Sequence, residues 1–450
     1  MLRQSIKKSA GVHDDTTLLV GLEGVVVDRV ELDPDGCRVV HLFTAPHAKD
    51  AGAVCPSCRT PATSVKGWVS TRPRDVALPA PARLVWHKRR WRCRASGCSR
   101  SSFTESIPQL GPGARVTARL KAAAGRAVAE GGATVTQAAR DHGLSWPVVS
   151  AAFTELATEM LPAEPAPVEA LGIDETRRGR PRFAPNPDTG VVEQVADRWH
   201  TGFVDLTGGH GLLGQVEGRS AADAGAWLAA QTPEWRDGVQ IVAIDMCPAY
   251  RAAVRAHLPH ATLVVDHFHI VHLANQTVSA VRRRVTATLR GRRVRKDDPE
   301  YGIRRRLLRN REDLTDEKFT DMWNRLIDLG RPGEEILSAW IAKEELRALL
   351  ALARTGPTRH QISTRLWTFY QWCADTTIPE LHRLAATIQA WWSAIEAFIL
   401  TGITKAASEG VNRLIKLEAR NAFGFRNPVN QRLRSRCASI RAALRPAKPG

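Results

Sequence analysis

The spacing of apolar and polar positions changes along the chain and predicts a different kind of structure in each part. Near the N-terminus, alternating apolar runs at residues 18–30 and 37–43 flank a turn-forming sequence at residues 33–36, which predicts a small β layer. Residues 114–160 have the period of helices instead. A proline-rich stretch at residues 162–167 follows, and we expect a stiff linker and a domain boundary there.

Beyond this linker the pattern becomes that of an α/β domain. Short apolar runs predict β-strands at residues 168–174, 199–206, 212–218, 239–245 and 261–266. Helical periods at residues 220–231 and 248–257 separate the third strand from the fourth and the fourth from the fifth. Three strands in succession, then helix, strand, helix and strand, is the element order of an RNase H-like α/β fold. The Arg- and Pro-rich segment between Glu175 and Val195 is expected to be a loop.

The rest of the chain is predicted to be mostly helical. We interpret residues 267–400 as a helical insertion into the α/β domain. A late helix is expected at residues 405–421, where Val411, Leu414 and Ile415 form an apolar face. The C-terminal end is basic, and we expect it to contact phosphates or to stay mobile.

Four of the eight cysteines fall into two close pairs, Cys55 with Cys58 and Cys93 with Cys98. Such pairs suit a structural Zn²⁺ with tetrahedral coordination, because each pair can bind the ion from one turn. His87 is an alternative ligand for one of the four cysteines, and four unrelated core cysteines are the other interpretation. The remaining cysteines are scattered, unlike those of a disulfide scaffold, which indicates a reducing, intracellular setting.

Residues 134–153 have the layout of two short helices joined by a turn. We expect Thr136 to cap the first helix, Gly143 to allow the turn and Ser145 to cap the second helix. This layout predicts a helix-turn-helix whose second helix enters the major groove of DNA, although alanine-rich helical hairpins without this role are common. The residues expected to face the groove are Ser145, Trp146 and Ser150.

The chain carries a formal net charge of +18, which predicts a polyanionic partner such as double-stranded DNA. Arginines are concentrated at residues 282–296 without interleaved acids, which favours a DNA-backbone surface over a solvated helix face. No apolar run is long enough to span a bilayer or form a signal peptide, so we expect a cytoplasmic protein that associates with the nucleoid. The candidate phosphate contacts are Arg283, Arg284, Arg293, Arg413, Lys416 and Arg420.

Three acids stand where a metal site could form. Asp174 and Asp245 each end a predicted strand, and Glu409 lies near the start of the late helix. The carboxyl ends of strands are where open α/β sheets place their chemistry. Because Mg²⁺ and Mn²⁺ prefer oxygen ligands, we expect these three acids to converge on such ions and to serve DNA cleavage and joining. Any one of them alone is more often a turn or capping residue.

Other residues compete for roles at this site. Glu175 follows the first acid directly and should face the opposite side of its strand, so we expect it to act from outside the ligand set. Asp266 also closes a predicted strand and is the rival of Asp245. With His267 and His269 it could instead position the substrate or form a separate metal site.

With these residues in view, the chain resembles the ISL-three family of insertion-sequence transposases, which belong to the DDE class. The resemblance covers nearly the whole length and includes the paired cysteines, the helix-turn-helix, Leu171-Gly-Ile-Asp-Glu175, Asp245-Met-Cys-Pro-Ala-Tyr250, Val265-Asp-His-Phe-His269, Ser408-Glu-Gly-Val-Asn-Arg-Leu-Ile-Lys416 and Gly424-Phe-Arg-Asn427. It implies an RNase H-like core interrupted by a helical insertion. It also implies binding of short terminal inverted repeats and Mg²⁺-dependent DNA cleavage and strand transfer. The family's catalytic acids carry over to Asp174, Asp245 and Glu409, and its four-cysteine pattern is met by the two cysteine pairs.

These features predict a division of the chain into a β and zinc-binding domain, a helix-turn-helix domain, a catalytic core, a helical insertion, a last core helix with the glutamate, and a basic tail. The corresponding ranges are 1–110, 111–161, 168–274, 275–402, 403–430 and 431–450. Synapsis of two DNA ends predicts a homodimer or higher oligomer. An inactive DNA-binding regulator derived from such an enzyme, or a nuclease that cuts without joining, are the alternative functions.

Overall fold

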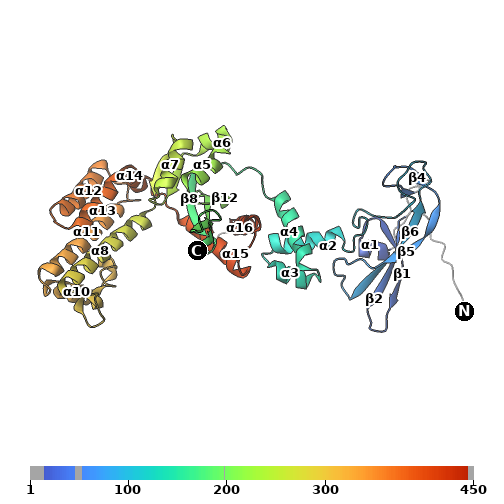
Figure 1. Ribbon diagram of the computed structural model, residues 1–450, viewed down its shortest axis with the longest axis horizontal. Coiled ribbons are helices and arrows are strands. Elements are labelled where there is room, and N and C mark those ends of the chain that lie inside the picture. The colour runs from blue at the N-terminus through green and yellow to red at the C-terminus, as the bar shows by residue number, and fades with distance from the viewer. Residues whose placement is uncertain (1–14, 46–52, 197, 444–450) are drawn as a thin grey trace. The chain divides into compact units, whose positions relative to one another are not determined.

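The computed structural model describes residues 15–45, 53–196 and 198–443 (Figure 1). The chain divides into two compact units, Met1–Leu161 and Pro162–Gly450. The boundary coincides with the proline-rich stretch that the sequence marks as a linker.

The first unit begins with a β layer. Its main sheet has the order β1-β2-β6-β5, with β7 paired to β6, and β3 pairs with β4 beside it. Val40, Leu42 and Trp86 fill the core beneath this sheet. Residues 18–20, expected in a strand, belong to helix α1 instead. The elements are α1 (Asp15–Val20), β1 (Val25–Leu32), β2 (Arg38–Thr44), β3 (Ala53–Val54), β4 (Pro61–Ala62), β5 (Val65–Thr71), β6 (Ala82–Arg92) and β7 (Ser102–Thr104).

Three helices complete this unit, and the last two form the expected helix-turn-helix. Gly143 has φ +61° in the turn between them. The first helix is capped by Thr134, whose side chain accepts from the Gln137 N–H, and not by Thr136 as predicted. Ser145 stands at the N-cap of the second helix without a side-chain capping bond. The helices are α2 (Ala118–Ala129), α3 (Val135–Asp141) and α4 (Trp146–Met160).

The second unit is built on a five-stranded sheet of order β12-β11-β8-β13-β14. β11 runs antiparallel to both β12 and β8, whereas β13 runs parallel to both β8 and β14. This is the topology of an RNase H-like fold, as the element order predicts. The strands are β8 (Ala170–Arg177), β11 (Trp199–Asp205), β12 (Leu212–Glu217), β13 (Ile241–Ile244) and β14 (Thr262–Val265), with helices α5 (Ala221–Ala229), α6 (Pro233–Gly238) and α7 (Pro248–His257) between them.

The segment expected to be a loop after Glu175 forms a hairpin instead, with β9 (Arg182–Pro185) antiparallel to β10 (Val192–Ala196). Its strands are short and exposed, so the period-two pattern that reveals buried strands is missing. The Asn186 side chain accepts from the Asp188 N–H and supports the turn.

Helices follow one another between β14 and the last two helices, where the sequence predicts a helical insertion (Figure 1). The arginine-rich run at residues 282–296 does not lie on a single helix, because α8 ends at Arg290 and Gly291 turns the chain with φ +57°. The elements are α8 (His267–Arg290), α9 (Pro299–Ile303), a 3₁₀ turn (Arg311–Asp313), α10 (Asp316–Ile327), α11 (Arg331–Leu350), α12 (Arg359–Ala374), α13 (Pro379–Ala390) and α14 (Trp392–Thr401).

Two further helices return to the sheet, α15 (Ala406–Asn421) and α16 (Pro428–Ala443). Val411 and Ile415 of α15 pack on Val204 and Leu212 of the sheet. The C-terminal tail expected from residue 431 is therefore a packed helix up to residue 443, and the expectation for residues 444–450 lies outside the described range. The buried Arg434 of α16 fastens it to α15 through Glu418, with Nη2 2.7 Å from Oε2.

Within the described residues, no single helix has the length and apolar character of a membrane span, whereas α13 and α14, which meet at a 68° bend, pass the same test as a pair.

Candidate functional site

Asp174 and Asp245 come together where β13 ends beside β8, in the middle of the sheet. Asp174 is on β8 and Asp245 directly follows β13, its parallel neighbour. The Lys405 ammonium lies between them, with Nζ 3.1 Å from Oδ1 of Asp174 and in contact with Oδ1 of Asp245. Only 1% of the Lys405 side chain is exposed. A buried positive charge is therefore held by two carboxylates that lie 71 residues apart in the sequence.

The electrostatics of this pair are set by burial and by like charge. Burial raises the pKa of Asp174, and Asp245 adds to that rise while Lys405 opposes it. Burial lowers the pKa of the Lys405 ammonium, but the two aspartates outweigh this effect and the pKa is raised. The site thus favours a cation next to the carboxylates.

Helix α15 is fastened to β8 by hydrogen bonds as well. Asn412 Nδ2 donates to Oδ2 of Asp174 at 2.8 Å, and the Thr176 hydroxyl donates to Oδ1 of Asn412 at 2.6 Å. Gly172 allows this approach, since a Cβ there would lie 2.3 Å from Oγ of Ser408. One carboxylate oxygen of Asp174 is therefore positioned by an amide and the other faces Lys405.

Glu175 lies closer to these acids than predicted. Carboxylate oxygens of Glu175, Asp174 and Asp245 all lie within 4.8 Å of one another. Burial raises the pKa of Glu175, and Asp174 and Asp245 raise it further.

Asp266 and His269 form a second group around Asp245. Ligand atoms of these three residues also lie within 4.8 Å of one another, and Nε2 of His269 is 3.1 Å from Oδ2 of Asp245. Asp266 caps α8 by accepting from the Phe268 N–H at 3.2 Å. Nδ1 of His267 lies 3.3 Å from Oδ1 of Asp266, the same oxygen that caps α8. Asp245 belongs to both acidic groups, whereas Asp266 belongs to one.

Glu409 is in the first turn of α15, as predicted. Its side chain is 43% exposed and lies 4.0 Å from Nη2 of Arg413. In the described part of the chain it belongs to neither acidic group that includes Asp245. However, Glu409 lies on α15 three positions before Asn412 and four positions after the N-cap residue Lys405. Side chains three or four positions apart on a helix are neighbours, so Glu409 and Asn412 share one face of α15. In sequence, Glu409 thus stands between the N-cap residue Lys405 and Asn412, which both contact Asp174.

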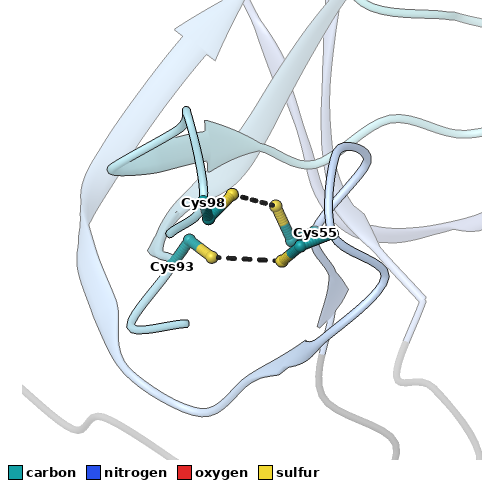
Figure 2. Close-up of side chains that lie close together, drawn as sticks. Cys55, Cys93 and Cys98 are labelled. Atoms are coloured by element: carbon teal, nitrogen blue, oxygen red, sulfur yellow. Dashed lines mark hydrogen bonds between the residues drawn. The ribbon is translucent and has the colours of Figure 1, made fainter. Parts of the chain in front are cut away.

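The four predicted zinc ligands lie together in the first unit. Sγ of Cys55 is 3.9 Å from that of Cys98 (Figure 2). Sγ of Cys58 is 3.5 Å from that of Cys93. A tetrahedral Zn²⁺ with Zn–S bonds of about 2.3 Å requires S–S separations of about 3.8 Å. Hydrogen bonds from Thr60 lower the pKa of Cys58 to about 6, which favours a thiolate. The four sulfurs therefore fit this ion.

His87 is directed elsewhere, so the alternative of a histidine ligand has no support in the geometry. Its Nε2 lies 2.9 Å from Nδ1 of His41 and its Nδ1 lies 2.7 Å from Oγ of Ser70.

The candidate DNA contacts differ in their exposure and in whether they pair with acids of the same chain. Trp146 of α4 is 52% exposed. Arg283 and Arg293 are exposed, as are the α15 cations Arg413, Lys416 and Arg420. By contrast, Arg284 binds Glu380 at 2.8 Å and Glu335 at 2.9 Å within the insertion.

Lys405 and Asn412 are functional candidates that the sequence analysis did not single out. Asn412 stands inside the quoted Ser408–Lys416 segment, three residues after Glu409, and its spacing could have revealed it. A lysine just before a helix carries no comparable signal, because its burial depends on two distant strands.

Family profiles match most of the chain. The profile described as "Transposase" matches residues 171–435, "Helix-turn-helix domain of transposase family ISL3" matches residues 105–157, and "zinc-finger of transposase IS204/IS1001/IS1096/IS1165" matches residues 51–98.

Individual relatives are similar over long stretches. The transposase for insertion sequence element IS1001 of Bordetella parapertussis is 27% identical over 425 residues, which cover 91% of this chain and 94% of the relative. The transposase for insertion sequence element IS1557 of Mycobacterium tuberculosis is 28% identical over 293 residues, or 61% of this chain and 65% of the relative. Among solved structures, the Drosophila P element transposase strand transfer complex has 8% identity and a TM-score of 0.38, covering 71% of this chain and 91% of that chain.

Proposed function

Because the chain belongs to the ISL3 family of transposases, we propose that it binds the terminal inverted repeats of an insertion sequence and catalyses metal-dependent cleavage and strand transfer of their DNA. The observation that carries this proposal is the convergence of Asp174 and Asp245 where β13 ends beside β8. Both acids are buried enough to favour a bound cation and open enough to be reached, with 15% and 17% of their side chains exposed.

The donor set suits a hard divalent cation such as Mg²⁺ or Mn²⁺. Oxygens of Asp174, Glu175 and Asp245 lie close together, and such ions prefer oxygen ligands. The close contacts of Lys405 with both aspartates support the same view, since they show that this place already holds positive charge. When bound, such ions would activate a water or a DNA 3′-OH and stabilise the leaving oxygen.

The chain's own residues have distinct tasks in this proposal. Asn412 fixes one oxygen of Asp174, so that the other is presented toward Asp245. Glu409 completes the ligand set by rotating its side chain along the face of α15 that already contacts Asp174. Its side chain is 43% exposed and lies 4.0 Å from Nη2 of Arg413, a contact that it would exchange for the metal.

The other parts of the chain would locate and hold the DNA. Ser145, Trp146 and Ser150 at the start of α4 are our candidates for contacts in the major groove. The exposed cations Arg283, Arg293, Arg413, Lys416 and Arg420 would bind phosphates. Zn²⁺ at the four cysteines would be structural, and a homodimer or higher oligomer would synapse two DNA ends. We expect this activity in the cytoplasm, on nucleoid DNA.

A strand-transfer assay tests this proposal. Labelled duplexes with the inverted repeats that flank the reading frame are incubated with the full chain and Mg²⁺. Glu409→Gln, Asp174→Asn and Asp245→Asn are each expected to lower joint-molecule formation at least about a hundredfold while DNA binding remains, because each removes a charged ligand. Glu164→Gln, in the linker, is the control and is expected to behave as wild type.

Other outcomes would select the alternatives. A protein that binds the repeats without cutting would be a regulator, and one that cuts without joining would be a nuclease. Normal strand transfer by Glu409→Gln would remove Glu409 from the ligand set.

A further inference from the structure

The turn after α15 contains an apolar residue that is fully exposed and has a left-handed backbone conformation. Phe423 is 99% exposed and has φ +52°. The described residues include three other non-glycine residues with positive φ, and all three are arginines. This backbone region is unfavourable for a bulky side chain, and Phe423 has no packing that would compensate for it.

The hydrogen bonds identify the turn as a Schellman motif. The Gly424 N–H donates to the Ala419 carbonyl at 2.8 Å, and the Phe423 N–H donates to that of Arg420 at 3.0 Å. Glycine is the usual residue at the left-handed position of this motif. Here phenylalanine takes that position and glycine follows it, so the ring stands out from the end of the helix.

The surroundings of Phe423 are basic. Arg420 and Arg426 flank it in sequence and are exposed, and Lys416 and Arg413 precede them on the exposed face of α15. Glu418, the nearest acid in sequence, is buried and paired with Arg434 and Arg441. A second copy of the chain would bring like charges together here, which disfavours a self-contact. A flat apolar ring among cations fits a nucleobase whose phosphates are bound by those cations.

We propose that Phe423 stacks on a base that is unpaired or turned out of the duplex near the cleavage site, an inference that rests on the proposed action on DNA. Bases within an intact duplex have no free face, so the ring needs a displaced base. Phe423 lies 14 residues beyond Glu409 in sequence, mostly along α15. At a rise of 1.5 Å per residue, the distance along the helix between Glu409 and Phe423 is about 21 Å. One DNA strand advances about 3.4 Å per nucleotide, so the stacked base would lie roughly six nucleotides from the reacting phosphate.

Two synthetic duplexes of one sequence test the proposal, one fully paired and one with a central unpaired 2-aminopurine. Wild type is expected to bind the second about tenfold more tightly and to quench its fluorescence, as base stacking on an aromatic ring does. Phe423→Gly should lose this preference and keep its affinity for the paired duplex. Phe423→Trp should keep the preference, and so should Phe183→Ala, which removes another exposed phenylalanine.

Thermal unfolding separates stacking from a structural role. Glycine relieves the left-handed backbone, so Phe423→Gly is expected to unfold at the same or a higher temperature than wild type. A lower unfolding temperature, a retained preference for the unpaired base, or a change only in oligomeric state would overturn the proposal. Failure of wild type to bind the paired duplex would instead count against the proposed action on DNA.

Discussion

At the scale of single residues, Lys405 controls the character of the candidate site. The ammonium balances two carboxylates that would otherwise face each other, and it does so where 1% of its side chain is exposed. A divalent cation bound by Asp174 and Asp245 would compete with it for the same oxygens. In the proposed metal site, the lysine would stabilise the metal-free protein and would move when the acids bind a metal.

Lys405→Met should expose this competition. Without divalent cations, the variant is expected to lose roughly 3 kcal/mol of unfolding free energy, because two buried carboxylates lose their partner. Added Mg²⁺ should raise its unfolding temperature more than that of wild type, since the ion no longer displaces a lysine. Calorimetry with and without Mg²⁺ measures both effects. Lys416→Met, which removes an exposed charge from the same helix, is the matched control, and an equal Mg²⁺ response in all three proteins would contradict the prediction.

Residue-level prediction from sequence succeeded where local spacing carried the information. The four cysteines lie together, as predicted. Each pair lies within one turn of the chain, so the prediction required only that these two turns lie side by side. Asp245 directly follows β13, as predicted, whereas Asp174 was predicted to end its strand and lies inside β8, which continues to Arg177. The salt bridges of Lys405 and the position of the Glu175 carboxylate were not predictable, because both depend on how separate strands and a helix meet in space.

At the scale of elements, the contact between β8 and α15 decides the geometry of the site. Gly172 is a point of close approach, where a Cβ would lie 2.3 Å from Oγ of Ser408 and 2.8 Å from Cδ2 of Leu206. Sequence analysis predicted both elements from their periodicity. Their crossing was not predictable, since a glycine in a strand does not reveal which element approaches it.

Gly172→Ala is expected to push α15 away from β8. Overpacking of this kind costs about 1–3 kcal/mol of unfolding free energy. Strand transfer should fall as well, because α15 carries Asn412 and begins directly after Lys405. Ser408→Ala should restore part of both losses, since the Ser408 hydroxyl has no hydrogen-bond partner among the described residues. Denaturant unfolding and the strand-transfer assay provide the measurements.

Gly410, a glycine on α15 itself, serves as the control, because its substitution by alanine is expected to raise the unfolding free energy. Gly410 is inside the helix and has no atom within 4 Å of its added Cβ. Gly410→Ala should therefore stabilise the protein by about 0.5–1 kcal/mol. A loss of stability in both alanine variants would mean that the contact at Gly172 is not the cause.

At the scale of the whole molecule, the chain consists of two compact units with different sources of stability. The second unit has a large core that continues from the sheet into the helical insertion. In the first unit, the cluster around the four cysteines has only a small core that includes Ala53, Trp91 and Phe103. Cores of this size need a metal or a disulfide to be stable, and these cysteines are not joined by disulfides. The boundary between the units was predictable because proline-rich composition is a local signal.

Selective removal of Zn²⁺ should therefore destabilise one unit alone. In calorimetry with Mg²⁺ present, a zinc-selective chelator is expected to shift the transition of the first unit to lower temperature and to leave that of the second unchanged, because metal binding contributes to folding only where the ligands are. Metal analysis should give one Zn²⁺ per chain, and Cys58→Ser should reproduce the effect of the chelator. Cys373→Ser is the control, because Cys373 is buried in the second unit far from the four ligands in sequence. Equal shifts of both transitions would show that the metal supports the whole chain and not the first unit.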